Sequence, residues 1–374
     1  MKLLNNMKKA GIITHYDVHN HGAHLQTYAL IQVLKKLGYD AKALQFQKNY
    51  DFMGGSRASN KYNISIKSIP VYFKYLVANG LGRTVYNYKK RKILSKFRKK
   101  HEIVGDYYSE ARDLDVVVIG SDEIFSIEAG PNPWYYGIGI PCKKEISYAA
   151  SFGPTSMEML KEHNMCSLVA AGLNNLKHIS VRDENSEKIV ENLTQVKPRI
   201  VCDPVLLFDF PKQIKQSIFN MFKKENKEKY CIVYSYDYNM NDVQTVNSIR
   251  KYARDNGLKI YSVGYFHKWC DRNINVDPLD IFKWFGSCEI VFTDTFHGTV
   301  ISLATGTQFV TKIRENGNKL EYLLKQYGVL DRKVQEFTEL IDIVKHDINY
   351  SNVNKTIIDI RHKSLMYLED ALGD

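Results

Sequence analysis

Short apolar runs alternate with amphipathic stretches along the chain and predict repeated β-α-β units. A strand is predicted over residues 9–14, followed by a helix that starts near Ala23 and carries an apolar residue at every fourth position up to Leu37. A second strand is predicted over residues 41–46. Since strands joined through a helix usually lie parallel in one sheet, the chain is expected to begin a parallel sheet here.

The same alternation continues to the C-terminus. Further strands are predicted over residues 115–120, 144–151, 179–183, 201–205, 230–236, 259–263, 289–293 and 309–313. Helices are predicted over residues 157–173, 184–192, 241–256, 278–285, 318–327 and 357–371. This pattern favours an α/β fold of two parallel-sheet domains in tandem.

Domain boundaries follow from a proline and from changes in composition. Pro204 closes a first domain at residues 1–207, into which a basic helical insert is placed at about residues 50–112. A second domain is placed at 208–345, and residues 346–374 form a C-terminal helix that packs back on the body. Polar residues collect at the predicted strand ends of both domains, which predicts a ligand cleft between the domains.

Length, charge and cysteine content narrow the class of protein. A chain of 374 residues is longer than a domain with a single hydrophobic core usually is. Its net charge of +11 favours an acidic partner such as a phosphorylated metabolite or an anionic membrane surface. No nucleic-acid recognition motif accompanies the charge. The six cysteines are scattered, which is typical of a reducing compartment, and no apolar run suggests a signal peptide or a membrane span. We expect a cytoplasmic protein, at most peripheral on the inner face of the membrane.

The segment 83–100 is strongly basic and carries Tyr86, Ile93, Leu94 and Phe97 between its charges. One interpretation is a solvated helix with a narrow apolar stripe. The other is a basic amphipathic helix that lies on an anionic leaflet or faces a phosphorylated acceptor.

His297 stands in the bend between the predicted strand 289–293 and a following helix. This position is the ligand-binding edge of an open α/β sheet, and a helix N-terminus there attracts anions. The loop 16–22 and the turn Gly120-Ser121-Asp122 occupy equivalent positions. Loop 16–22 and the start of its helix contain three histidines without a carboxylate at helical spacing, so no metal site is expected.

Six short motifs in order resemble the polysaccharide pyruvyl transferase family. They are Asn20-His21-Gly22-Ala23 with the following Leu25–Leu30, Gly120-Ser121-Asp122, Ser147–Gly153, Ser180-Val181-Arg182-Asp183, Asp203-Pro204 and Phe296-His297-Gly298-Thr299. The family is similar in fold to the GT-B glycosyltransferases, so two Rossmann-like domains facing a cleft are implied, with the first domain on the acceptor side and the second on the donor side. The implied reaction transfers a pyruvyl group from phosphoenolpyruvate to two hydroxyls of a sugar, in a surface polysaccharide or its lipid-linked precursor, and forms a ketal.

The resemblance also assigns roles to individual residues. His297 matches the family's catalytic histidine, Arg182 matches an arginine that holds the donor's anionic groups, and Lys319 is a further candidate for donor binding. Many members carry an arginine where this chain has Thr295. The remaining candidates are Gly298 and Thr299 for the donor, and Asp17, Asn20, Gly22, Gly120, Ser121 and Ser151 for the acceptor or the cleft.

The chemistry requires these residue types. Phosphoenolpyruvate carries a carboxylate and a phosphate, which guanidinium and ammonium groups bind well. Its double bond must accept a proton, a task suited to histidine. Asp122 or Asp17 is a candidate to take the hydroxyl proton, and no cofactor or metal is expected beyond the donor.

Two other functions are compatible with the sequence. One is a GT-B glycosyltransferase that uses a nucleotide sugar. The other is a non-catalytic protein that binds polyanions through its basic segment. The acceptor sugar, its hydroxyl pair and the oligomeric state are not encoded in any pattern of the sequence.

Overall fold

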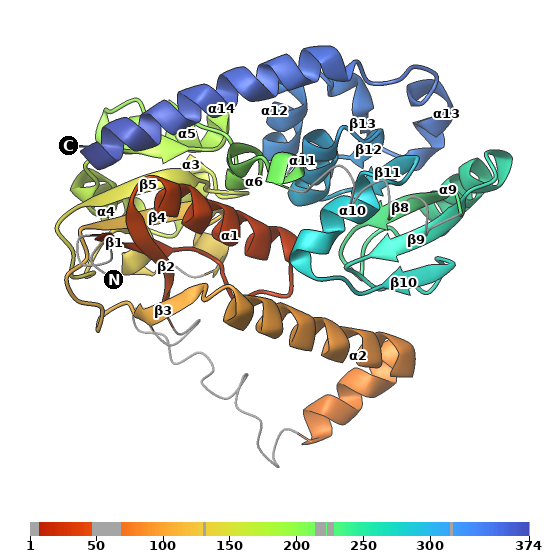
Figure 1. The fold of residues 1–374 in the computed structure, drawn as a ribbon, viewed down its shortest axis with the longest axis horizontal. Coiled ribbons are helices and arrows are strands. Elements are labelled where there is room, and N and C mark those ends of the chain that lie inside the picture. The colour runs from red at the N-terminus through yellow and green to blue at the C-terminus, as the bar shows by residue number, and fades with distance from the viewer. Residues whose placement is uncertain are drawn as a thin grey trace.

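Two parallel β-sheets, one in each part of the chain, form the framework of the computed structural model (Figure 1). The structure describes residues 7–46, 69–129, 132–213, 222, 228–314 and 317–373. The polar opening of the predicted insert, residues 51–63, and most of the basic stretch 214–227 lie outside these ranges. The two sheets confirm the predicted α/β class.

The first sheet has seven strands in the order β3-β2-β1-β4-β5-β6-β7. They are β1 (Lys8–Ile13), β2 (Tyr39–Gln45), β3 (Val104–Tyr107), β4 (Val116–Asp122), β5 (Glu145–Ala150), β6 (Ser180–Val181) and β7 (Arg199–Ile200). All pairs are parallel, with Ile12 of β1 opposite Val118 of β4. Both side chains are fully buried, as expected for the centre of a parallel sheet covered on both faces.

Helices join these strands and bury their apolar sides against the sheet. They are α1 (His21–Lys36), α2 (Ile69–Lys100), α3 (Met157–Glu162), α4 (Cys166–Asn175) and α5 (Glu184–Thr194), with the short turns η3 (Ile127–Ala129) and η4 (Pro133–Tyr136). The helix predicted over 157–173 is two helices, because Asn164 adopts a left-handed conformation with φ of 56° between them.

The second sheet has six parallel strands in the order β10-β9-β8-β11-β12-β13. They are β8 (Tyr230–Tyr234), β9 (Lys259–Val263), β10 (Arg272–Ile274), β11 (Ile290–Thr293), β12 (Phe309–Lys312) and β13 (Lys333–Val334). The accompanying helices are α9 (Val243–Asp255), η5 (Pro278–Asp280), α10 (Ile281–Phe285), α11 (Phe296–Thr305), α12 (Asn318–Gln326), η6 (Leu330–Arg332), η7 (Phe337–Glu339) and α13 (Leu340–Ile343).

Residues 201–205, predicted as a strand, instead lead into a helix. The strand β7 ends at Ile200, and α6 (Pro204–Phe208) is followed by α7 (Phe210–Gln213). The Asp203 carboxylate accepts a hydrogen bond from the Val205 amide at 3.0 Å, and Pro204 occupies the first helical turn. An aspartate cap followed by proline is a helix start, so the strand prediction was wrong.

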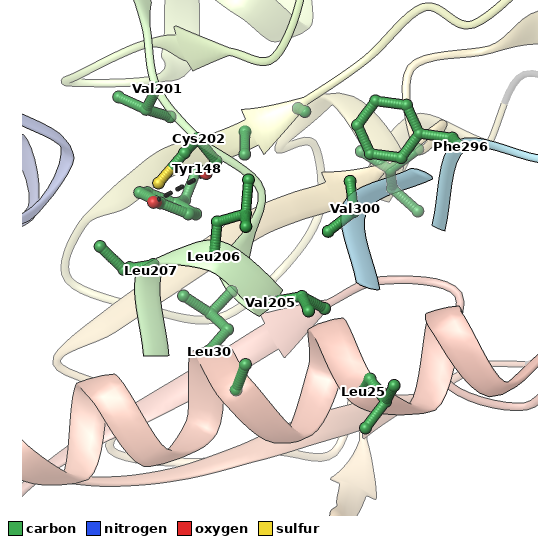
Figure 2. Close-up of a cluster of buried hydrophobic side chains, with 14 of the residues drawn as sticks. Leu25, Leu30, Tyr148, Val201, Cys202, Val205, Leu206, Leu207, Phe296 and Val300 are labelled. Atoms are coloured by element: carbon green, nitrogen blue, oxygen red, sulfur yellow. Dashed lines mark hydrogen bonds between the residues drawn. The ribbon is translucent and has the colours of Figure 1, made fainter. Parts of the chain in front are cut away.

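Helix α6 is wedged between one helix of each domain. Figure 2 shows its Val205 and Leu206 beside Leu25 of α1 and Val300 of α11, in one continuous apolar cluster. All four side chains are almost completely buried. The first residues after the N-terminal sheet thus fix α1 and α11 relative to each other.

The C-terminal helix α14 (Tyr350–Gly373) runs from the second domain back across the first (Figure 1). The Tyr350 hydroxyl donates to the carbonyl oxygen of Thr307 in the second domain. The Tyr367 hydroxyl donates to the Ser147 carbonyl at 2.8 Å, and the Ser364 hydroxyl accepts from the Cys202 amide at 2.9 Å. The helix therefore bridges both domains. It begins seven residues earlier than the sequence pattern indicated, at Tyr350 rather than 357.

Helix α2 spans both domains on the opposite side of the molecule and is kinked at Gly80 (Figure 1). Arg83 pairs with Asp237 of the second domain at 3.0 Å, whereas Arg98 pairs with Asp17 of the first domain at 2.9 Å. In the part of the chain that the structure describes, no helix is both long enough and apolar enough to span a bilayer.

Candidate active site

A cavity of about 620 Å³ lies between the two domains, at the carboxyl ends of strands from both sheets. Its first wall follows β1 and β4 and includes His15, Asn20, Asp122, Glu123 and Glu128. The facing wall follows β8, β9, β11 and β12 and includes Tyr236, Tyr265, Asp294, His297, Arg314 and Lys319. The predicted interdomain cleft is confirmed.

His297 is positioned by the sharp start of α11. The Thr295 hydroxyl accepts a hydrogen bond from the Gly298 amide at 3.0 Å and caps the helix. The imidazole is 5% exposed and lines the cavity. Its Nε2 lies 3.7 Å from Oδ2 of Asp203 and has no hydrogen-bond partner among the described residues. A nearly buried imidazole with a carboxylate behind it is suited to carry a proton.

Arg182 links the two aspartates behind His297. Its guanidinium donates to Asp203 at 3.1 Å and to Asp122 at 3.3 Å, and it stacks 4.0 Å from the centre of the Phe296 ring. Only 2% of the Arg182 side chain is exposed. Burial alone would raise the pKa of both aspartates. The interactions with Arg182 and His297 lower these pKa values by more than burial raises them. The pKa of Asp203 is therefore lowered, and that of Asp122 falls to about 2.

Two cations face the cavity from the second domain, each paired with a carboxylate. Lys319 of α12 contacts Glu123 across the cleft, and Arg314, just after β12, contacts Asp294. The Arg314 side chain is 46% exposed, and the Lys319 side chain is 25% exposed. Both groups are therefore accessible to an anionic ligand that displaces or shares their carboxylate partners.

The domains also meet directly through the loop before α1. The Asn20 amide donates to the Tyr236 hydroxyl at 3.2 Å, and the Tyr265 hydroxyl lies 3.4 Å from Asn20 Oδ1. At Gly22, a β-carbon would come within 2.1 Å of His297 Cγ. Glycine is thus required here because the N-terminus of α1 approaches the imidazole from the other domain.

The predicted site residues fall into two groups. His297, Asp122, Lys319 and Asn20 line the cavity. Gly22 contacts His297 from behind, and Gly298 and Thr299 are buried within the first turn of α11.

Arg182, Gly120, Ser121, Ser151 and Asp17 do not line the cavity, in contrast to the predicted contacts. Arg182 is enclosed by its carboxylates, and Gly120 packs against the β5 backbone at Tyr148. The Ser121 hydroxyl donates to Gln26 at 3.0 Å, and that of Ser151 to Asp183 at 2.6 Å, both in the protein interior. Asp17 faces Arg98 on the other side of its loop.

Several cavity residues were missed by sequence reasoning: His15, Glu123, Glu128, Tyr236, Tyr265 and Arg314. His15, Glu123, Tyr265 and Arg314 come within three residues after the end of a predicted strand, and Tyr236 is the last residue of one. This position was the available signal, and Glu128, farther along the chain, lacked it. Asp203 was quoted only as part of a motif, although it is the carboxylate nearest His297. Within the described residues, no group of three or more His, Cys, Asp or Glu side chains is arranged to hold a metal ion.

Two parallel-sheet domains with strand ends facing one cavity define a protein of the GT-B fold. The polysaccharide pyruvyl transferase family model matches residues 20–313, and the chain belongs to this family of transferases. No curated protein matches in a sequence comparison.

Solved structures share the fold at low sequence identity. One is the UDP-GlcNAc 2-epimerase of Methanocaldococcus jannaschii in complex with UDP-GlcNAc and UDP, with 12% identity, a TM-score of 0.50 and coverage of 95% of this chain and 100% of that chain. Another is UGT89C1 of Arabidopsis thaliana complexed with UDP-L-rhamnose, with 11% identity, a TM-score of 0.50 and coverage of 98% of each chain.

Proposed function

We propose that the protein transfers a pyruvyl group from phosphoenolpyruvate to two hydroxyls of one sugar residue, in a polysaccharide or its lipid-linked precursor, and forms a pyruvate ketal. The single observation that carries this proposal is His297 in the cavity wall, with Asp203 3.7 Å behind it and two cations nearby. The family membership supports action on a polysaccharide.

In the proposed reaction, Arg314 and Lys319 hold the phosphate and carboxylate of the donor, since both cations line the cavity. The N-terminus of α11 adds a favourable dipole. This assignment replaces Arg182 as the group that touches the donor. Arg182 instead keeps Asp122 and Asp203 ionised and in place, which makes it a positioning residue.

His297 protonates the terminal carbon of the donor's double bond, and the Asp203 carboxylate stabilises the imidazolium beforehand. A sugar hydroxyl adds to the central carbon and loses its proton to Asp122. The bond from that carbon to the phosphate oxygen then breaks, the departing phosphate takes the proton held by Asp122, and inorganic phosphate leaves. A second hydroxyl closes the ketal, and its proton restores His297.

The experiment is to incubate the protein with phosphoenolpyruvate labelled in its carbon atoms and with candidate glycans, and to detect the ketal by mass spectrometry. Parallel reactions use labelled nucleotide sugars. Transfer of label from a nucleotide sugar and none from phosphoenolpyruvate would overturn the proposal in favour of a glycosyltransferase.

His297→Ala is expected to lower turnover at saturating donor by roughly 10²–10⁴-fold, because a general acid typically contributes that factor. Calorimetric titration of phosphoenolpyruvate into the same variant should give a dissociation constant near that of the wild type. Lost binding with full turnover would make His297 a ligand holder only.

We further propose that the protein works at the inner face of an anionic membrane, with α2 in contact with the lipid. Three apolar residues that the sequence predicted to contact lipid pack against the protein instead. Tyr86, Leu94 and Phe97 are 7%, 1% and 0% exposed. A different set faces outward, namely Val77, Leu81, Val85 and Tyr88, at 70%, 72%, 49% and 60% exposed. Spacings of three and four residues place Leu81, Val85 and Tyr88 along one face of the part of α2 that follows the kink at Gly80, whereas Val77 lies before the kink.

A further inference from the structure

A second pocket, separate from the cleft, lies between the loop before α1 and helix α2. Its volume is about 440 Å³, and its lining includes His19, Arg91, Ser95 and Arg98. Two guanidinium groups, an imidazole and a hydroxyl thus surround one space, with Asp17 as the single carboxylate in its lining. The steps assigned to the cleft use none of these residues.

Asp17 does not neutralise the pocket. It pairs with Arg98 at 2.9 Å, and Arg98 also lies 2.8 Å from Nε2 of His24, so that guanidinium is fixed in place. Arg91 has no ion pair with any residue that the structure describes. Burial lowers the pKa of His19, and the neighbouring Lys90 and Arg91 lower it further, which reports a positive potential at the pocket.

The chemistry of the lining selects the ligand class. Guanidinium groups bind phosphate oxygens in a bidentate manner, and a serine hydroxyl adds a further donor. Arg98 is held in place and Arg91 has no ion pair with a described residue. Together they offer more hydrogen-bond donors than a ligand with a single carboxylate would use. The volume of about 440 Å³ is ample for a diphosphate.

The position of the pocket connects it to the cleft. His19 lines the pocket and the next residue, Asn20, lines the cavity, so the two spaces lie on either side of one loop. Along the chain, Arg91 comes shortly after Tyr88, the last of the exposed apolar residues of α2. The pocket and the cleft thus lie beside one loop, an arrangement that suits a glycan with its sugar in the cleft and a phosphate attached to it.

We propose that this pocket binds the phosphate or diphosphate group of a phosphorylated glycan acceptor, with Arg91 as the principal contact. The proposal rests on the proposed function for the identity of the acceptor, but the binding of a phosphate group does not require catalysis.

The direct test is calorimetric titration of inorganic diphosphate at about 0.15 M salt, where the Debye length is about 8 Å and general attraction is screened. The proteins are wild type, Arg91→Glu, Lys96→Glu, Lys319→Met and the double variant Arg91→Glu with Lys319→Met. Lys96 is an exposed lysine on the same helix that does not line the pocket, so it controls for the charge change. Lys319→Met removes a cation of the cleft.

Arg91→Glu should weaken diphosphate binding at least 10-fold, in line with the roughly 10- to 150-fold loss expected for hydrogen bonds to a charged group. Lys96→Glu should change it less than threefold, and the Arg91 effect should persist in the Lys319→Met background. Equal losses in Arg91→Glu and Lys96→Glu would overturn the proposal, as would wild-type affinity in Arg91→Glu. This readout is independent of whether pyruvyl transfer occurs.

A second measurement distinguishes the source of the phosphate. With an acceptor glycan that carries a diphosphate, Arg91→Glu should raise KM at least 10-fold and leave kcat unchanged, whereas the same glycan without phosphate should show equal KM in both proteins. If Arg91→Glu reduces only the co-sedimentation with phosphatidylglycerol vesicles, and not the binding of soluble diphosphate, the pocket is a general membrane contact and the proposal fails.

Discussion

Arg182 is the residue on which the buried charges of the site depend. It is the cation that contacts both Asp122 and Asp203, and the Asp203 side chain is 0% exposed. Arg182→Met should destabilise the protein by about 3–5 kcal/mol, because removal of one partner leaves uncompensated buried charge. Arg199→Met is the matched control. Its side chain is 65% exposed and pairs with Asp370 at 3.9 Å, so its loss should cost at most about 1 kcal/mol. Urea unfolding measures both values, and equal costs would contradict this account.

Asp122 makes the stability of the fold depend on pH. Its pKa is lowered from 3.8 to about 2 in the folded protein, so the ionised form stabilises the fold above pH 4. That contribution, about 2 kcal/mol, should be lost as the pH falls from about 4 to about 2. The cost of Asp122→Asn in urea unfolding should therefore shrink between pH 4.5 and pH 2.5. Asp113→Asn, at a side chain 87% exposed, is the control for the effect of pH on the rest of the protein.

Of the predicted site residues that line the cavity, three stand where a strand end and a motif coincide, and Lys319 was assigned through the resemblance alone. His297, Asp122 and Asn20 satisfy both conditions and line the cavity. Arg314 follows β12 without any motif, so its approach to the cavity depends on how the second domain faces the first. The enclosure of Arg182 was not predictable, because a sequence does not show that two aspartates from distant strands surround an arginine.

At the scale of elements, the central strands were predictable because each is a short apolar run. The strands β3, β7, β10 and β13 were not predicted, because each is very short and carries polar or charged residues. Residues 201–205 are apolar enough for a strand, but Asp203 and Pro204 start a helix. For α2, the charge pattern alone left the orientation of the helix undetermined. Contacts such as the hydrogen bond from the Tyr86 hydroxyl to the Ile274 carbonyl, at 3.0 Å, turn that face inward.

The outward face of α2 predicts the residues that contact lipid. Leu81→Ser with Val85→Ser should reduce co-sedimentation with anionic vesicles at least 10-fold, since burying a Val or Leu side chain contributes about 1.5–3 kcal/mol. Val196→Ser with Val243→Ser is the control pair, exposed at 54% and 76% on other elements. Wild-type binding should also fall with added salt, because each basic residue near the leaflet contributes about 1 kcal/mol. Equal losses in both pairs, or no dependence on salt or on lipid charge, would refute a specific role for α2.

At the scale of the whole molecule, Gly22 and His297 couple the two domains. Gly22→Ala should lower both stability and turnover, because its methyl group would meet His297 Cγ at 2.1 Å and must displace the ring or the domain. In a His297→Ala background the space is vacated, so Gly22→Ala should cost markedly less. A double-mutant cycle of unfolding free energies measures this coupling. Additive costs would show that the contact is relaxed in solution.

The chain crosses between the domains twice, once after β7 and again along α14. Two bodies joined by a single tether can twist and slide, but two neighbouring connections favour a rotation about the line that joins them. Such a rotation must also release contacts that α2 and the loop before α1 make with the second domain, such as Arg83 with Asp237 and Asn20 with Tyr236. Because α6 and α14 contact each other through Arg361 and the Leu206 carbonyl, at 2.7 Å, both crossings lie along a common axis. Any opening that admits a bulky glycan should therefore move Lys319 away from Glu123 along a fixed arc. On closing, the same arc returns Lys319 to Glu123 without a search through other arrangements.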